Sequence, residues 1–452
     1  MYPMRILIAG AMAVTLGALP SAARAETLTQ ALASAYQNNP NIASALLSVK
    51  SAAEDIALRQ AGKLPTIGAA VDGTFNWAAT NSGFTTSDSL TGGLSYRQTL
   101  FDNFRTDAEI EQARALADLS AQAFRNAEQN VLLSVADAYM SVIRDSELVT
   151  LRANNIKFFE AQLQSAKDRL EVGEGTKIDV SQAQARLAQG VASHRSAIAS
   201  LQTSQASYQR WVGHKPQNLS SNVGFSNMVP GSIDAAIASA EERHPAIMSA
   251  KAAIRSSQAG TDAAEAAFGP TLDLIGSLCA IGCNAGGVSI NASGSVRLSL
   301  SIPIYAGGAL GASVRKANLG QIKSEVDAMS AYDQVREATI TSWATLQNAS
   351  AQIVSAQAAV SSVQLVLEGV IQERDLGQRT TLDVLNSQAE LTSAREALIS
   401  ANTSRVVALF SLIAATGRLS AADLNLPVTI KSADAYTARV EDTWQELRTV
   451  KE

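Results

Sequence analysis

The feature that most constrains this chain is a stretch of 79 consecutive residues, from 94 to 172, that contains neither glycine nor proline. These two residues destabilise a helix interior most strongly, so their absence permits one very long helix. The region 104–171 is rich in Ala, Gln, Glu, Leu and Arg and predicts a helix of 68 residues. At a rise of about 1.5 Å per residue it would extend about 100 Å, which no single globular domain can enclose.

The same pattern occurs twice along the sequence. An offset of 204 or 205 residues superposes the two halves, and it places a second long helix over 309–375. The residues that align are Gly173 with Gly377, Thr176 with Thr380, Asp179 with Asp383, and Phe101 with Tyr305. Such ordered self-similarity predicts an internal duplication. The predicted units are a first repeat, 26–213, a linker, 214–232, a second repeat, 233–417, and a C-terminal segment, 418–452.

The first 25 residues have the features of a secretory signal peptide. Arg5 supplies a positive charge, a run of 14 largely apolar residues follows, and Ala23-Arg24-Ala25 forms a cleavage site of small residues. A retained anchor is the alternative, but a helix needs about 20 apolar residues to span a bilayer. We expect cleavage after Ala25. No later segment reaches 18 uninterrupted apolar residues, so no further transmembrane helix is expected.

Four short segments show the alternation of apolar and polar residues that is typical of β-strands. Arg97 and Arg297 lie on the polar side of their segments. The pattern fits either a soluble sheet with one buried face or a membrane β-barrel with a polar lumen. The four predicted strands are 66–77, 90–100, 271–280 and 295–304.

The membrane barrel is favoured because long helices, and no further strands, flank each strand pair, so nothing in the sequence covers the apolar face. Arg97 and Arg297 would then face the pore. Four strands are too few to close a barrel, which needs about eight, and open edges cannot exist in hydrocarbon. We therefore expect a mainly α protein with membrane β, in which three chains form one 12-stranded barrel that continues into a long α-helical barrel. The alternative is a non-channel periplasmic helical rod or scaffold.

The turn between the two long helices of each half carries the motif Gly-x-x-Thr-x-x-Asp-Val, at 173–180 and again at 377–384. This duplicated motif, together with the paired strands, resembles the TolC family of outer-membrane channel proteins, and the resemblance covers essentially the whole mature chain. It implies a homotrimer with a 12-stranded outer-membrane barrel, a periplasmic helical barrel and an equatorial belt. Residues 214–232 and 418–452 are the expected belt segments.

The resemblance also implies that the two turns form a periplasmic tip, closed at rest by links between neighbouring helices. The counterparts of the lock pair are Asp179 and Arg379. Asp383 matches the first acid of a constricting carboxylate ring, but the second ring position is Asn386. Arg374 stands where the family often has a lock tyrosine. These departures predict a weaker cation filter and a gate with different contacts.

The turn residues also have a purely structural explanation. Thr176 with Asp179, and Thr380 with Asp383, fit a capping box, in which Thr caps the helix start and the acid binds a free backbone N–H. Gly173 and Gly377 precede these caps in the turns. The sequence leaves open whether these residues only cap helices or also form the gate.

The remaining candidates carry little chemistry. Cys279 and Cys283 are the only cysteines, and either a disulfide or two free thiols is possible in an oxidising compartment. No further ligand accompanies them and the three histidines are scattered, so no metal site or other cofactor is expected. No catalytic motif is present, so we expect no enzyme. The net charge of −5 argues against nucleic-acid binding.

The function that the resemblance implies is a passive exit duct in the outer membrane of a Gram-negative bacterium, in contact with outer-membrane lipid and extending into the periplasm. Such a duct docks a periplasmic adaptor (membrane fusion) protein and an inner-membrane transporter of the RND or ABC type. The cargo would be small toxic compounds, in tripartite efflux, or proteins, in type I secretion. The sequence does not distinguish these cargoes.

Overall fold

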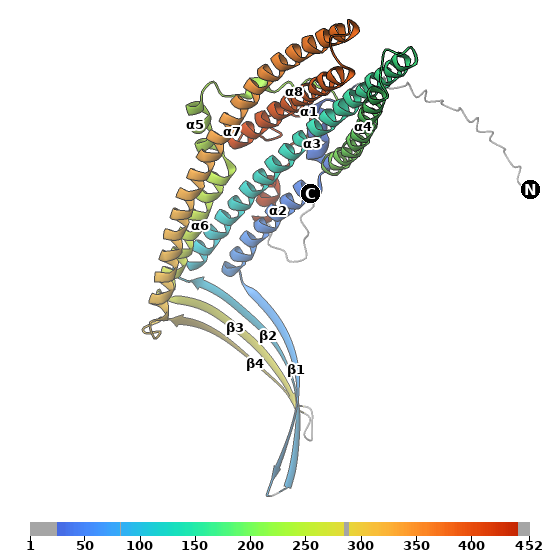
Figure 1. Ribbon diagram of the computed structural model, residues 1–452. Helices are drawn as coiled ribbons and strands as arrows, with labels where there is room; N and C mark the ends of the chain where they lie inside the picture. Colours follow the sequence, from blue (N-terminus) through green and yellow to red (C-terminus); the bar gives the residue numbers. More distant parts are fainter. Residues whose placement is uncertain (1–24, 82, 284–288, 442–452) are drawn as a thin grey trace, which may run out of the picture.

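The computed structural model describes residues 25–81, 83–283 and 289–441 of the chain, and it describes side chains there except at 226 and 281–291. All but the last residue of the expected signal peptide, and residues 442–452 of the expected C-terminal segment, lie outside the described residues. The molecule is elongated, with a curved four-stranded sheet at one end and the turns of two long helical hairpins at the other (Figure 1).

The two halves of the chain contain the same elements in the same order. The first half contains α1 (Leu28–Asn38), α2 (Pro40–Gln60), the short 3₁₀ turn η1 (Ala61–Lys63), β1 (Thr66–Thr80), β2 (Gly83–Phe101), α3 (Arg105–Glu171) and α4 (Lys177–Val212). The second half contains α5 (Ile233–Arg243), α6 (Pro245–Ala266), β3 (Thr271–Cys283), β4 (Ser289–Ser301), α7 (Ala309–Asp375) and α8 (Thr381–Ala415). A 3₁₀ turn, η2 (Ser226–Met228), lies between the halves, and α9 (Asp434–Glu441) follows the second.

The prediction of two very long helices is confirmed. α3 and α7 each have 67 residues, so each extends about 100 Å. Their bounds agree with the predicted ranges to within one residue. The lack of glycine in α3 and of proline in both helices therefore marked continuous helix.

The four strands form one antiparallel sheet in the order β1-β2-β3-β4, so the pairing of β2 with β3 joins the two halves. The strands cover the predicted segments and extend beyond them, with one exception. The fourth strand was expected to reach residue 304, but β4 ends at Ser301. Pro303 lacks a backbone N–H and cannot donate to a ladder, so the strand stops before it.

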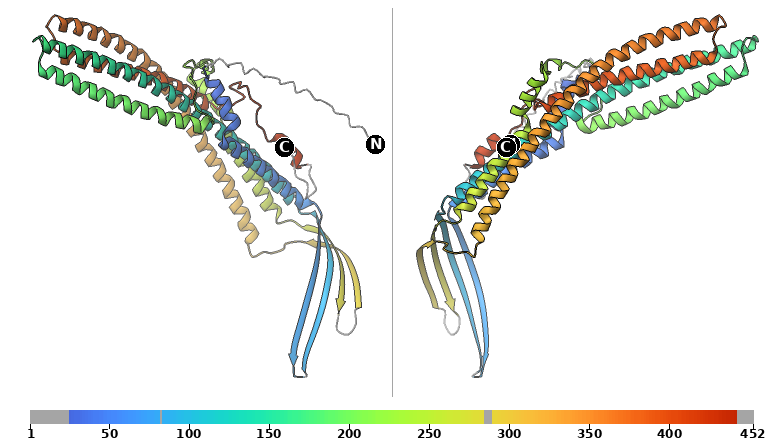
Figure 2. Two further views of the ribbon diagram at one scale, coloured as in Figure 1. Left: turned by 90° about the vertical axis from the view of Figure 1, so that its right-hand side faces the viewer. Right: turned by 60° about the vertical axis from the view of Figure 1, so that its left-hand side comes forward.

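The long helices form two antiparallel hairpins, α3–α4 and α7–α8, that lie side by side (Figure 2). Close approach within the first hairpin depends on a small residue. A Cβ added to Gly190 on α4 would lie 3.1 Å from the ring of Phe159 on α3. The many Ala, Ser and Gly residues of these helices therefore permit close helix packing where a bulkier core would separate them.

The main hydrophobic core lies near the middle of the molecule, where α1, α2, α3 and the ends of α4 and α8 meet the segment 419–433. Tyr139 and Tyr208 are fully buried there. The Tyr208 hydroxyl donates to Oε1 of Glu26 at 2.7 Å, and the Tyr139 hydroxyl lies 2.8 Å from the Glu26 carbonyl oxygen. Burial raises the pKa of Tyr139 to about 12. Glu26, the first residue of the expected mature chain, is thereby held in the core.

Two glycines allow a test of helix termination. Gly417 and Gly377 both have a positive φ, of +71° and +81°, that disfavours other residues. A Cβ at Gly417 would also lie 2.7 Å from the Cα of His244, whereas nothing lies within 4 Å of one at Gly377. We expect Gly417→Ala to lower the thermal unfolding midpoint clearly more than Gly377→Ala, which costs only about 1–2 kcal/mol. Equal losses measured by circular dichroism would contradict this packing.

Candidate functional site

The sheet exposes a continuous apolar face. Cross-strand register places ten large apolar side chains on one side of the sheet, and each is between 52% and 82% exposed. We call this set the apolar face: Ile67, Val71, Phe75, Trp77, Leu90, Leu94, Leu278, Val296, Leu298 and Leu300. Within the part of the chain that the structure describes, no element covers these side chains (Figure 2). So large an apolar surface marks an interaction with protein or membrane.

The height of the apolar face fits a bilayer. Ile67 and Trp77 lie on this face at opposite ends of β1, about 33 Å apart along the strand. At the usual barrel tilt of about 40° that length gives about 25 Å of height, which is the apolar band of outer-membrane barrels. Trp77 stacks with Phe84 at one end, with ring centroids 6.2 Å apart, and Tyr96 pairs with Ile67 at the other. Aromatic residues at both limits are typical of membrane interfaces.

The opposite face of the sheet is polar. Arg97 and Arg297 lie in one cross-strand row, joined through Ile275 of β3. Arg97 forms an ion pair with Asp273, at 3.2 Å, and Thr99 donates to the same carboxylate at 2.9 Å. The two predicted pore-facing arginines therefore share the polar face, on the side opposite the apolar face.

The disulfide considered between Cys279 and Cys283 is not formed. Both residues belong to β3, and Cys279 has a free thiol. Four residues along one strand separate two Cα atoms by about 13 Å, whereas a disulfide needs less than about 7 Å. The predicted strand ended at residue 280, between the two cysteines, whereas β3 continues through Cys283 and holds them apart.

At the other end of the molecule, both capping boxes are present. The Thr176 hydroxyl accepts from the Asp179 backbone N–H at 3.2 Å, and the Asp179 carboxylate accepts from the Thr176 N–H at 3.0 Å. Thr380 and Asp383 repeat this arrangement at the start of α8 with the same two distances. Gly173 and Gly377 have positive φ values of +83° and +81° just after α3 and α7 end. These residues therefore end one helix and start the next in each turn.

Hydrogen bonds affect the ionisation of these tip residues. The backbone and hydroxyl of Thr380 hydrogen-bond the Asp383 carboxylate and hold its pKa below the ordinary value of an aspartate. The contribution of this carboxylate to folding is present above the ordinary pKa and is lost only as the pH falls through the lowered one. The hydrogen bond to Glu373 raises the pKa of Arg379.

The expected lock pair is not in contact within one chain. Arg379 donates from Nε to Oε2 of Glu373 in its own turn, at 2.7 Å, whereas Asp179 belongs to its helix cap. Asp179 and Arg379 nevertheless line the same small cavity, of about 160 Å³, between the two turns.

Arg374 and Asn386 form the actual links between the hairpins near the tip. Arg374 is buried on α7, and its Nη1 donates to Oε1 of Gln162 on α3 at 2.6 Å. Arg186 on α4 donates to Oδ1 of Asn386 on α8 at 2.8 Å. Both bonds connect the first hairpin to the second. They involve the two positions where the sequence departs from the family pattern.

Further polar contacts between the hairpins lie behind the tip, and sequence reasoning missed them. Arg152 on α3 contacts Glu396 on α8 at 2.7 Å and also donates to the Ser193 carbonyl on α4 at 3.0 Å. Gln388 donates to Asn155 at 2.9 Å. The partners are more than 200 residues apart, apart from the Ser193 contact, so no local pattern in the sequence marks them.

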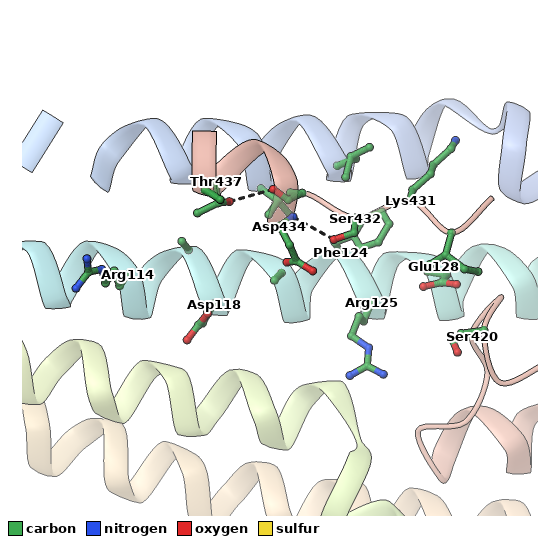
Figure 3. A pocket seen from close by; sticks show the side chains of 18 of the residues that line it. Arg114, Asp118, Phe124, Arg125, Glu128, Ser420, Lys431, Ser432, Asp434 and Thr437 are labelled. Atoms are coloured by element: carbon green, nitrogen blue, oxygen red, sulfur yellow. Dashed lines mark hydrogen bonds between the residues drawn. The ribbon is translucent and has the colours of Figure 1, made fainter. Parts of the chain in front are cut away.

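A cavity of about 700 Å³ lies near the middle of the molecule, which we call the equator, between α2, α3, α6 and the C-terminal segment (Figure 3). Two of its acids have protein partners. Asp118 pairs with Arg255 at 2.6 Å, and Glu128 accepts from the Ala421 backbone N–H at 2.6 Å. Burial raises the pKa of Glu128. Among the described residues, no group of three or more His, Cys, Asp or Glu side chains could hold a metal ion.

Helix α7 has a second exposed apolar surface, which we call the α7 stripe. It consists of Leu319, Ile322, Val326 and Met329, each between 55% and 67% exposed. α7 and α8 also each contain an 18-residue window apolar enough to cross a membrane, with mean hydropathies of 1.4 and 1.5, and these windows are 6% and 39% buried. The sequence predicted no further transmembrane helix because it contains no uninterrupted apolar run of 18 residues. These two windows reach a high mean hydropathy although they contain polar residues.

An apolar membrane-sized sheet face, continuous with helices of about 100 Å, defines a channel-forming protein of the outer membrane. A sequence model described as outer membrane efflux protein matches the chain twice, over residues 31–214 and 236–418. The chain therefore belongs to the outer membrane efflux protein family, the family of TolC channels. It is an outer-membrane exit duct and not an enzyme.

Individual relatives agree with this assignment. The chain is similar to the outer membrane efflux protein BepC of Brucella suis, with 35% identity over 95% of this chain and 93% of BepC. It is 24% identical to the outer membrane protein TolC of Escherichia coli, over 93% and 88% of the two chains. It is 26% identical to the alkaline protease secretion protein AprF of Pseudomonas aeruginosa, over 87% and 84%. The solved structure of CusC has the same fold, with a TM-score of 0.77, 20% identity and coverage of 86% and 92%.

The caps provide a local test. Thr176→Ala removes the hydroxyl that accepts the Asp179 N–H and should destabilise the first turn of α4 by about 1 kcal/mol. Hydrogen exchange at residues 179–180, whose N–H groups bond to Thr176, should then become about fivefold faster. Gln184→Ala, at an exposed position about two turns further along α4, is the matched control and should leave exchange at 179–180 unchanged. Unchanged exchange in Thr176→Ala would show that the cap does not stabilise this turn.

Proposed function

We propose that three copies of this chain form one duct, with a closed 12-stranded barrel in the outer membrane and a helical barrel in the periplasm. The observation that carries the proposal is the apolar face on a sheet whose two edges, β1 and β4, have no partner strand among the described residues. Unpaired backbone groups are too costly in hydrocarbon, so the edges must pair with other copies. Four strands per chain reach a sufficient number only by oligomerisation.

The α7 stripe supports the same assembly. Its four residues are spaced by three, four and three positions, which places them on one side of the helix. A neighbouring copy packed along the whole length of α7 would cover the stripe and, separately, the apolar window, which does not include the stripe residues. We assign the window to a subunit interface and not to a membrane span, because α7 is one continuous helix of 67 residues, far longer than the thickness of a membrane.

The two halves support the proposal through their equal dimensions. α3 and α7 have the same length, and α4 and α8 differ by one residue. We take the halves as an internal repeat, with 214–232 and 418–452 as the equatorial segments. Six hairpins of nearly equal length, two from each chain, can then surround one axis at similar positions.

We further propose that the turns of the two hairpins are the gate of the duct. Asp383 would form the constriction, and Asp179 and Arg379 would contact neighbouring chains from the cavity that they share. Within one chain, Arg374–Gln162 and Arg186–Asn386 would hold the second hairpin against the first. These bonds are polar and few, so a docked partner could break them without exposing a large apolar core.

The duct would be passive, so the energy for export would come from partners. We propose a periplasmic adaptor protein and an inner-membrane transporter of the RND or ABC type. BepC is named as an efflux protein and AprF as a protease secretion protein, which supports both small compounds and proteins as cargo classes. The alternative, a periplasmic rod, gives no role to the apolar face.

The assembly is tested by the mass and conductance of the purified protein in one detergent. We expect a trimer that conducts ions in a planar bilayer. Val326→Asp places a charge on the α7 stripe and should shift the mass toward monomer, because an interface with a buried unpaired charge is unstable. Gln334→Asp, at an exposed polar position off the stripe, is the control and should stay trimeric. A wild-type monomer without conductance would refute the duct.

The gate is tested by single-channel recording of tip variants. Arg374→Ala and Gln162→Ala remove the same buried charge-assisted hydrogen bond, so both should raise the open probability, by about tenfold or more. Arg379→Ala and Asp179→Ala should raise it less, because the contacts proposed for these residues with neighbouring chains are partly exposed ion pairs, which are worth only about 0–1 kcal/mol. Unchanged gating in both Arg374→Ala and Gln162→Ala, with intact trimers, would show that this bond does not hold the gate.

A further inference from the structure

The polar face of the sheet carries four charged side chains among its described residues. They are Asp72 on β1, Arg97 on β2, Asp273 on β3 and Arg297 on β4. The formal charges of this face therefore sum to zero. What matters for a solute in the duct is how these charges are distributed along the strands.

Two of the four charges neutralise each other. Arg97 and Asp273 form an ion pair at 3.2 Å, and the Thr99 hydroxyl also binds the carboxylate. The Asp273 side chain is only 17% exposed, so it has limited access to a solute. This pair therefore adds little net field to the space in front of the sheet.

The other two charges are far apart. Arg297 shares a cross-strand row with Thr66, Arg97 and Ile275, whereas Asp72 lies six residues beyond Thr66, about 20 Å further along β1. The Arg297 side chain is exposed, and it makes no hydrogen bond or ion pair with any group that the structure describes. It is therefore an uncompensated positive charge at its own level.

The surroundings of Arg297 leave its guanidinium accessible. Its neighbours on the same face of β4 are Ser295 and Ser299, and Ser295 hydrogen-bonds Ser277 across the strands at 2.9 Å. Because these serine side chains are short, they do not cover the guanidinium group of Arg297. Thr66 is the first residue of β1, so this row lies at the helical end of the sheet (Figure 1).

We propose that Arg297 forms a ring of three cationic side chains that binds anionic groups of cargo where the β-barrel meets the helical barrel; this rests on the trimeric duct proposed above. Guanidinium recognises phosphate and carboxylate groups by paired hydrogen bonds. Charges of one sign inside a low-dielectric wall concentrate oppositely charged solutes. The ring would act over about 8 Å at physiological salt and over about 30 Å at 0.01 M.

The test is block of single channels by inositol hexakisphosphate, a polyanion, added to the barrel side of a planar bilayer. We expect interruptions of the wild-type current that occur at lower blocker concentration when the salt is lowered. Arg297→Ala should raise the blocking concentration by about tenfold or more. Arg297→Lys keeps the charge and should retain most of the block. Ser295→Ala, on the same face two residues away, is the matched control, and its channel should be blocked at the same concentration as the wild type.

The outcomes separate this proposal from the duct on which it rests. All variants are first shown to be trimers by mass. A wild-type protein that does not conduct would refute the duct and the ring together. If the wild type conducts, two results would refute the ring and leave the duct intact. One is an equal blocking concentration in the wild type and Arg297→Ala, and the other is no block in any of the proteins.

Discussion

The structure depends on one constraint, which is that backbone N–H and C=O groups cannot stay unpaired in hydrocarbon. The sheet satisfies this requirement between β1, β2, β3 and β4, but both of its edges lack a partner strand among the residues that the structure describes. Its exposed apolar face would be unfavourable in water, so the sheet requires an apolar surrounding medium. One chain therefore has an incomplete fold, and the proposed trimer follows from that incompleteness. The pairing of β2 with β3 is central, because it fixes the two halves in one sheet and sets where their helices begin.

The helical part is stabilised in a different way. Near the equator the hairpins meet a large core that contains Tyr139, Tyr208 and Phe410, all fully buried. Toward the tip the buried clusters are smaller, and polar contacts such as Arg152–Glu396 join the hairpins. Stability is thus concentrated at the equator, whereas the tip is held by bonds that can be exchanged for water at modest cost. The gate proposed at the tip would need this distribution, because it has to open without dissociating the chains.

The charged residues at the two ends of the molecule are also held in different ways. At the tip, the acids Asp179 and Asp383 are fixed by helix caps, which position a negative charge at the start of α4 and α8. This arrangement is favourable in itself, because the N-terminus of a helix carries a partial positive charge. Capping and gating are therefore compatible roles for the same residue. In the sheet, the charged residues of the polar face lie on strands, so their position along the strands is set by the register of the sheet.

The sequence alone determined the elements, because helix and strand propensity, periodicity and capping act over a few residues. It predicted α3 and α7 almost to the residue, the four strands, and the capping boxes at Thr176 and Thr380. It could not predict which distant side chains meet. The tertiary structure alone decided that Arg374 binds Gln162, and that Arg152 binds Glu396, across the two hairpins. The physical reason is that such contacts depend on the relative height of helices and strands far apart in the chain, and no local pattern specifies that height.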